Sequence, residues 1–257
     1  ASGEIVKAEA LLRWDHPQSG LISPEDFIPI AEHTGMIVSI GNWVFEEALN
    51  QSRQWRALRP DFTVSVNVSP VQFYRSNEAY CHEWLSLCED VGRLAGAEPA
   101  VSLEITEGLM LNADDTVMGK LAAFQNAGIK ISLDDFGTGY SSLSYLRKFN
   151  VDYLKIDQSF VQNIEFDPAS GALCEAIIVM AHKLGLKVIA EGIESAAQRD
   201  KLFDAGCDYG QGYLYGQPIA AAKSVPIVVL PDPVTPITRM NMAKGPWETH
   251  CPSGGCQ

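Results

Sequence analysis

Short apolar runs that end at a polar, metal-capable side chain recur along the chain, and most are followed by room for a helix. The seven runs lie at residues 5–12 with Glu9, 63–68 with Asn67, 101–106 with Glu104, 129–133 before Asp134 and Asp135, 153–156 with Lys155, 188–190 before Glu191, and 209–215 with Gln211. Runs of this length are typical of buried strands. Strands that alternate with helices predict parallel βαβ units.

The segments between these runs carry helix signals. Ser23 and Pro24 open the first helix as an N-cap serine and a first-turn proline. Further helical patterns cover residues 42–58, 116–127, 172–184 and 195–205. The last three patterns end at Gly128, Gly185 and Gly206, and glycine is the usual residue just beyond a helix C-terminus.

This alternation predicts a (β/α)₈ TIM-type barrel. Such a barrel takes about 250 residues and carries its active site at the C-terminal ends of the strands. The chain has 257 residues, 46% of them hydrophobic, which suffices for one large core. A doubly wound sheet is the alternative, with its ligand at a switch point in the strand order. A polar residue near the end of nearly every strand favours the closed ring.

The stretch from Lys130 to Leu143 carries the strongest local chemistry. A short apolar strand leads into Asp134 and Asp135, followed by a loop that contains Gly137 and Gly139. Adjacent carboxylates repel each other and need a counter-charge. Oxygen ligands suit magnesium, manganese or calcium. A solvated turn is the structural alternative, since aspartate and glycine are common turn formers.

Composition limits the setting in which the chain works. The net charge of −13 argues against nonspecific binding to a nucleic acid polymer. No apolar run approaches the length of a membrane span and no signal-peptide pattern opens the chain, so no membrane contact is expected. The six cysteines lack the spacing of a complete zinc site, which favours reduced thiols and a cytoplasmic location.

Several short motifs, in order, resemble those of the EAL domain family of bacterial cyclic di-GMP phosphodiesterases. They are Glu9-Ala10-Leu11 with Leu12-Arg13-Trp14, residues 65–69, residues 103–107, Asp134-Asp135-Phe136-Gly137-Thr138-Gly139, residues 154–157, residues 190–194 and residues 211–213. The resemblance covers roughly residues 3 to 218. It implies a barrel that hydrolyses one phosphodiester of cyclic di-GMP to give linear pGpG.

The resemblance also implies a two-metal site for Mg²⁺ or Mn²⁺. Its metal ligands would be Glu9, Asn67, Glu104, Asp134, Asp135 and Glu191, and its catalytic residues Glu191, Lys155 and Asp135. Two cations about 3.5–4 Å apart can activate water and absorb the charge that develops at phosphorus. Lys155 would orient the water or stabilise that charge, with a salt bridge to neighbouring acids as its structural alternative. Glu191 would act as general base or as a ligand.

Other residues receive supporting roles from the same resemblance. Arg13, Gln211 and Leu11 would line the substrate pocket, with the planar fork of Arg13 on a phosphate. Glu107 would stabilise the loop from Asp135 to Tyr140. Taken alone, Arg13 and Gln211 would be assigned to an ordinary polar surface. Glu194 would either contact a guanine edge or cap the following helix, and we favour the cap.

The chain departs from the family pattern at both ends. Nothing matches the strand that family members usually carry before the first motif, so seven strands are counted where a barrel needs eight. Either the chain is a piece, another chain fills the gap, or a later segment does; residues 225–230 are one candidate for such a strand. We expect an EAL barrel at residues 1–219 and a C-terminal extension at 220–257 with a flexible end.

Two functional alternatives remain open at this level. A receptor that binds cyclic di-GMP without turnover, or an inert regulatory EAL module, would typically lack metal ligands or loop glycines, and all are present here. A metal-dependent barrel lyase would also use acids and a lysine, but it has no motif support. A homodimer and fusion to sensory or regulatory domains are further expectations from the resemblance.

Overall fold

The computed structural model describes residues 5–74, 84–86, 100–137, 146, 149–220 and 235–242. Its main feature is a parallel sheet whose strands run in the order β1, β4, β5, β6, β7, β8, β9, β11 and β10. A further parallel pairing joins β11 back to β1, so the sheet curls into a ring. This arrangement confirms the predicted TIM-type barrel and excludes the open doubly wound sheet.

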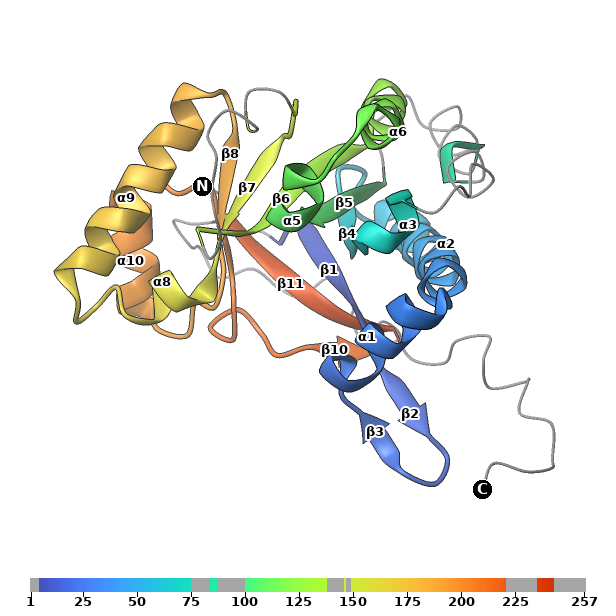
Figure 1. Ribbon diagram of the computed structural model, residues 1–257. Coiled ribbons are helices and arrows are strands. Elements are labelled where there is room, and N and C mark those ends of the chain that lie inside the picture. The colour runs from blue at the N-terminus through green and yellow to red at the C-terminus, as the bar shows by residue number, and fades with distance from the viewer. Residues whose placement is uncertain are drawn as a thin grey trace, which may run out of the picture.

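All seven predicted strands are present with shifted ends, and the last, predicted at 209–215, ends at Gln211. They are β1 (Lys7–Leu12), β4 (Thr63–Asn67), β5 (Val101–Thr106), β6 (Lys130–Phe136), β7 (Tyr153–Ile156), β8 (Lys187–Ala190) and β9 (Tyr209–Gln211). Two strands that the sequence did not indicate are β10 (Ile219–Ala220) and β11 (Thr235–Met242). A two-stranded antiparallel hairpin, β2 (Trp14–His16) and β3 (Gly20–Ile22), projects from the barrel (Figure 1).

Helices flank the ring on opposite sides (Figure 1). They are α1 (Pro24–Thr34), α2 (Ile37–Arg56), α3 (Pro70–Tyr74), α5 (Glu107–Leu111), α6 (Asp115–Asn126), α8 (Gln158–Gln162), α9 (Pro168–Lys183) and α10 (Ala196–Asp204). Ser23 and Pro24 begin α1 as predicted, although the serine side chain makes no capping hydrogen bond. Gly128, Gly185 and Gly206 have φ between 82° and 89°, the left-handed conformation expected of helix-ending glycines.

The core lies inside the ring and between the ring and its helices. Val64, Leu103 and Leu154 on the strands are fully buried, and aromatic residues fill the layer below α2. Phe45 stacks on Trp84 with ring centroids 4.2 Å apart, and Trp55 packs edge-on against Phe62 at 5.0 Å. This continuous packing holds the strand ends in fixed relative positions.

The eighth place in the ring is filled by a later segment, but not by the one proposed from sequence. Strand β11 (235–242) pairs with β1 on one side and with β9 on the other. Residues 225–230 lie outside the described part of the chain, as does the predicted flexible end at 244–257. The division into 1–219 and 220–257 stays a prediction.

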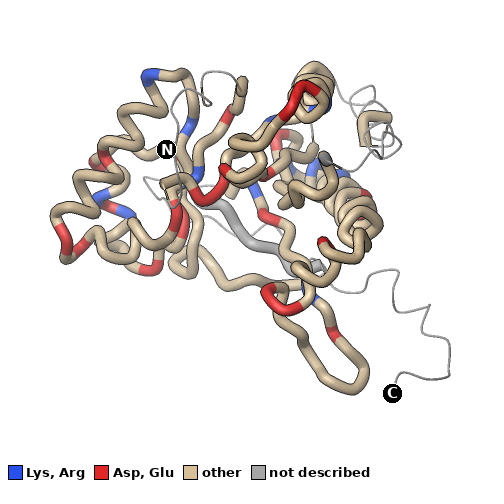
Figure 2. Tube along the Cα trace, in the orientation of Figure 1, with Lys and Arg blue, Asp and Glu red and all other residues tan. Residues whose placement is uncertain are grey.

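Among the described residues, no helix is long and apolar enough to cross a membrane. Acidic residues are distributed over the helices on both sides of the barrel as well as at its centre (Figure 2). The negative charge of the chain is therefore not confined to the candidate site. Cys174 and Cys207 are buried free thiols, and burial raises the pKa of the first to about 11 and that of the second to about 12.

Candidate active site

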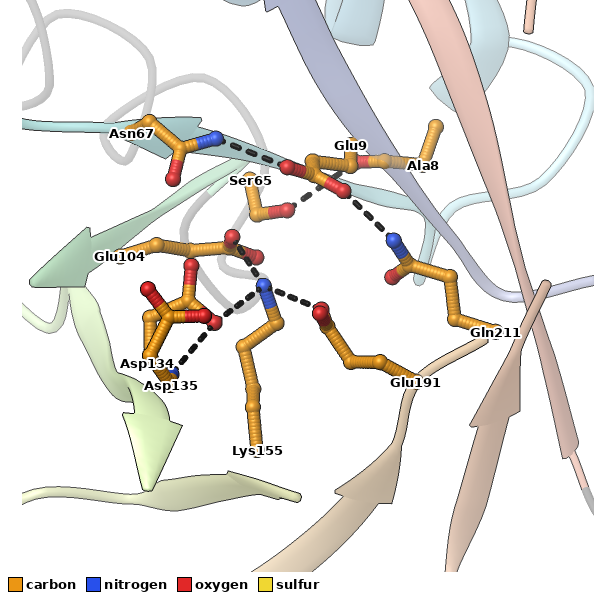
Figure 3. Close-up of polar contacts among 10 residues, drawn as sticks. All are labelled: Ala8, Glu9, Ser65, Asn67, Glu104, Asp134, Asp135, Lys155, Glu191 and Gln211. Atoms are coloured by element: carbon orange, nitrogen blue, oxygen red, sulfur yellow. Dashed lines mark hydrogen bonds and ion pairs between the residues drawn. The ribbon is translucent and has the colours of Figure 1, made fainter. Parts of the chain in front are cut away.

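The polar residues predicted at the strand ends meet inside the barrel (Figure 3). The side chains drawn together are those of Glu9, Asn67, Glu104, Asp134, Asp135, Lys155, Glu191 and Gln211. They meet because the C-terminal ends of parallel strands lie at the same end of the barrel. Asn67 is the register partner of Glu104, and Asp134 that of Thr106. Each strand thus contributes one or two groups near its C-terminal end, where the side chains meet.

Lys155 lies at the centre of this cluster. Its Nζ is 2.5 Å from Glu104 Oε2, 2.7 Å from Glu191 Oε1 and 3.0 Å from Asp134 Oδ1. The lysine side chain is 1% exposed and that of Glu104 is 3% exposed, so water screens these contacts little. One ammonium therefore holds three carboxylates that would otherwise repel one another.

Burial and mutual repulsion shift the acids toward their neutral forms. Burial raises the pKa of Glu104 to about 8 and that of Glu191 to about 7, and Lys155 opposes both shifts. Burial and the neighbouring Asp134 raise the pKa of Asp135. The surrounding carboxylates outweigh desolvation at Lys155 and raise its pKa well above the usual range. The cluster therefore contains more carboxyl groups than its single lysine can keep fully ionised.

Glu9 is fixed separately, by two side-chain amides. Asn67 Nδ2 donates to Glu9 Oε1 at 2.8 Å, and Gln211 Nε2 donates to Glu9 Oε2 at 2.5 Å. Each carboxylate oxygen thus accepts a hydrogen bond from one side-chain amide. Gln211 Oε1 is buried, and within the described part of the chain it has no hydrogen-bond partner. A donor or cation supplied by a ligand would satisfy it.

The backbone at the end of β6 is distorted so that both aspartates face the site. Asp135 has φ of 55°, an uncommon conformation for a non-glycine residue, and the register of β6 against β7 shifts between Leu133 and Phe136. The Asp135 N–H donates to Asp134 Oδ1 at 3.0 Å. One oxygen each of Asp134, Asp135 and Glu191 lies within 4.8 Å of the others.

The donor set fits a hard divalent cation. Carboxylate and amide oxygens are what Mg²⁺ and Mn²⁺ prefer, and no thiol or imidazole faces the cluster among the residues drawn in Figure 3. The excess of carboxylates over the single lysine favours binding of a cation. The predicted ligands therefore lie where a cation could reach them, and their assignment as ligands stays a proposal.

The remaining predicted residues are Glu107, Arg13 and Leu11, of which only Glu107 has a described contact with the Asp135 loop. Glu107 begins α5, and its Oε1 accepts a hydrogen bond from the Gly137 N–H at 3.0 Å, a contact with the start of the loop it was expected to stabilise. Residues 138–145 of that loop lie outside the described part. Arg13 follows β1, half-buried, with Nη1 donating to the Leu12 carbonyl at 2.8 Å. Leu11 is half-buried in β1.

The sequence interpretation missed two local features near the site. Gly212 follows Gln211, and a β-carbon there would lie 2.1 Å from the Ile193 carbonyl oxygen, so no larger residue fits without movement. The preference for Glu194 as a helix cap was wrong: Ser195 caps α10 in a capping box with Gln198, and Glu194 is exposed. The Ser195-to-Gln198 spacing was the available signal.

The family model described as "EAL domain" matches residues 1–218. A curated relative from Pseudomonas aeruginosa, "Bifunctional diguanylate cyclase/cyclic di-GMP phosphodiesterase MucR", is 40% identical over 227 residues, covering 86% of this chain and 32% of its own length. "Cyclic di-GMP phosphodiesterase PdeR" from Escherichia coli is 38% identical over 219 residues, covering 85% and 32%. The chain thus spans about a third of the length of these relatives.

Solved structures agree with the sequence relatives. "PaMucR Phosphodiesterase, c-di-GMP complex" superposes with a TM-score of 0.74 at 39% identity, covering 84% of this chain and 86% of that one. "Structure of EAL Enzyme Bd1971 - cGMP bound form" gives a TM-score of 0.75 at 37% identity, covering 86% and 60%. With the barrel, the ordered motifs and the match over residues 1–218, the chain belongs to the EAL domain family.

Proposed function

We propose that this chain hydrolyses cyclic di-GMP to linear pGpG in a reaction that depends on Mg²⁺ or Mn²⁺, with two ions per site. The single observation that carries the proposal is the complete acidic cluster around Lys155, within 3.0 Å of three carboxylates. Relatives named cyclic di-GMP phosphodiesterases, at 38% and 40% identity, support the substrate. A solved EAL structure with that nucleotide bound, at 39% identity, supports it further.

Glu9, Asn67, Glu104 and Asp134 would hold one ion, and Asp134, Asp135 and Glu191 would hold the second. Asn67 would offer its amide oxygen, because its Nδ2 donates to Glu9. When bound, the ions supply a more acidic water and positive charge for the phosphate oxygens. The two amides on Glu9 would keep its carboxylate from rotating as ligands exchange.

The remaining chemistry belongs to the side chains. The oxygen of water attacks phosphorus, one phosphorus–oxygen bond of the ring breaks, and a hydroxyl and a phosphomonoester result. Glu191 would serve as a ligand of the second ion or as the general base that takes a proton from the attacking water. Lys155 would stabilise the negative charge that grows on the phosphate. Arg13, close after β1, would bind a phosphate of the substrate, with Leu11 and Gln211 lining the pocket.

A receptor without turnover is the alternative. It would require a defective site, whereas every predicted ligand is present and the residues drawn in Figure 3 converge. The short span of the chain relative to its relatives supports fusion to further domains. A homodimer and a cytoplasmic setting complete the proposal, the latter in keeping with the free thiols of Cys174 and Cys207.

The test is incubation with cyclic di-GMP and Mn²⁺, followed by chromatography for linear pGpG. Glu9→Gln removes the charge of a proposed ligand while keeping its size, and Glu175→Gln is the matched control on the exposed face of α9. Product from the parent and the control, but about 10²-fold or more less from Glu9→Gln, is expected. Binding of intact nucleotide with no product from the parent would contradict the enzyme and favour the receptor.

A further inference from the structure

The strand that closes the barrel comes from outside the segment that matches the EAL family. The match ends at residue 218, whereas β11 covers residues 235–242. In the sheet, β11 lies between β9 and β1 (Figure 1). The last and first strands of the family match are thus joined through a strand that the family motifs do not include.

The pairing of β11 covers both of its edges. On one edge, six consecutive residues from Ile237 to Met242 are register partners of Lys7 to Leu12 in β1. On the other edge, Thr235 to Ile237 pair with β9, and Met240 and Asn241 pair with β10. Pro236 is the second residue of the strand, near the start, where a missing N–H is tolerated. This is the pattern of an interior strand.

One hydrogen bond of the site links the two strands on either side of β11. Glu9 is the register partner of Arg239, and Gln211 that of Ile237, so β11 separates the backbones of these two site residues. Adjacent strands are about 4.8 Å apart, which puts β1 and β9 roughly 10 Å apart across β11. The side chains of Glu9 and Gln211 nevertheless meet at 2.5 Å in the barrel interior. That contact requires both strands to be held at fixed separation and register.

The Lys155 cluster does not depend on the pairing of β11 with β1 and β9. Lys155 and its three carboxylates come from β5, β6, β7 and the residue after β8, which pair consecutively with one another. Loss of β11 would expose the edges of β1 and β9 while leaving these pairings intact. The two halves of the acidic site can therefore be perturbed separately.

We propose that residues 235–242 act as a positioning strand for the active site: by pairing with β1 and β9 they hold Glu9 against Gln211. The Lys155 cluster forms without them. The role of Glu9 in metal binding rests on the proposed function, but the pairing itself does not. Without residues 235–242, the edges of β1 and β9 would accept the same strand as a separate peptide, because parallel backbone pairing supplies the recognition.

Hydrogen exchange on the intact chain tests the pairing without any assay of activity. The amides of residues 237–242 should exchange about 10²-fold or more slowly than those of a synthetic peptide of the same sequence. Exchange at the rate of the free peptide would overturn the proposal, whatever the enzyme does. A chain that shows protection but no hydrolysis would instead contradict only the proposed function.

Two further comparisons test the positioning role, with Mn²⁺ binding followed by calorimetry. Ending the chain at residue 234 should weaken Mn²⁺ binding about 10–100-fold, the range seen when a supporting contact to a metal ligand is lost, whereas ending it at 242 should not. The peptide 235–242 added in trans should restore binding. Unchanged Mn²⁺ affinity in the chain that ends at 234 would refute the role.

A point substitution covers the case in which the shortened chain does not fold. Met240 has register partners on both edges, Ala10 in β1 and Ile219 in β10, so Met240→Pro removes an N–H that faces a neighbouring strand. It should weaken Mn²⁺ binding in the same direction as the truncation. Met240→Leu, which keeps the N–H and a similar volume, should bind Mn²⁺ within about twofold of the parent. Equal affinities for the two variants would overturn the proposal.

Discussion

Replacement of Lys155 by methionine tests the electrostatic logic of the site in isolation from catalysis. Methionine has a similar length and fits a buried position, but it carries no charge. It would leave Glu104, Glu191 and Asp134 gathered around an apolar side chain, where the ammonium now lies 2.5–3.0 Å from each of them. Removing one partner of a buried ion pair costs about 3–5 kcal/mol, because the remaining charges stay desolvated.

The loss of unfolding free energy in Lys155→Met should depend on pH, and the raised pKa values determine the direction of that dependence. In the folded parent, burial raises the pKa of Glu104 from 4.5 to about 8. A group whose pKa is higher in the folded state than in the unfolded state stabilises the fold fully at pH below its unfolded-state pKa. That stabilisation is lost as pH rises through its folded-state pKa. Without Lys155, which lowers this pKa, the shift grows. We therefore expect Lys155→Met to lose less unfolding free energy near pH 5 than near pH 9, because the difference from the parent grows as pH rises above about 8.

Urea denaturation of the parent and Lys155→Met in chelator-treated buffer at both pH values measures this difference. Lys187→Met is the matched control, since Lys187 pairs with Asp208 at 2.7 Å but its side chain is 61% exposed, and its loss should be about 0–1 kcal/mol. Mn²⁺ should restore part of the stability of Lys155→Met at pH 9 by mass action. Equal losses for the two lysines, or a loss independent of pH, would refute the reasoning.

Three further predictions concern single contacts. Gln211→Leu removes the donor to Glu9, so it should destabilise by about 1.5–3 kcal/mol in urea titration and weaken Mn²⁺ binding; unchanged binding would contradict it. Gly212→Ala places a β-carbon against the Ile193 carbonyl and should cost about 1–3 kcal/mol, whereas Gly119→Ala, which meets open space, should not. Hydrogen bonds from Lys187 and His182 lower the pKa of Asp208 despite its burial. Asp208→Asn should therefore lose about 1 kcal/mol of unfolding free energy at pH 7, and this loss should fade as pH falls below 3.8. A loss that stays constant with pH would argue against this prediction.

The strands and helices of the barrel could be predicted because their signals are local. The glycines that end α6, α9 and α10 and the apolar runs of the strands each lie within a few residues of the element that they predict. The start of α2 was placed at residue 42 instead of Ile37, because the tertiary core buries its first turn, including Ile37 and Val38. Hairpin β2–β3 and strand β11 escaped notice, since their pairing partners and not their own composition define them.

The candidate site divides in the same way. Residue types at strand ends predicted which side chains would converge, because parallel strands present one common rim. The sequence could not predict that Glu9 is held between Asn67 and Gln211, or that Lys155 contacts three carboxylates at once. Those contacts depend on the curvature and stagger of the ring, which place residues as distant as Glu9 and Gln211 within one hydrogen bond.

The sequence by itself determined the class of fold, the family and the set of acids available for a cation, since periodicity and motif order are properties of neighbouring residues. Only the tertiary structure decided which segment completes the ring. The sequence offered residues 225–230 as one candidate, yet β11, with Pro236 near its start, pairs with β1 and β9. The reason is physical: an edge of a sheet is satisfied by any backbone that can reach it in register, and reach is set by chain geometry and not by local propensity.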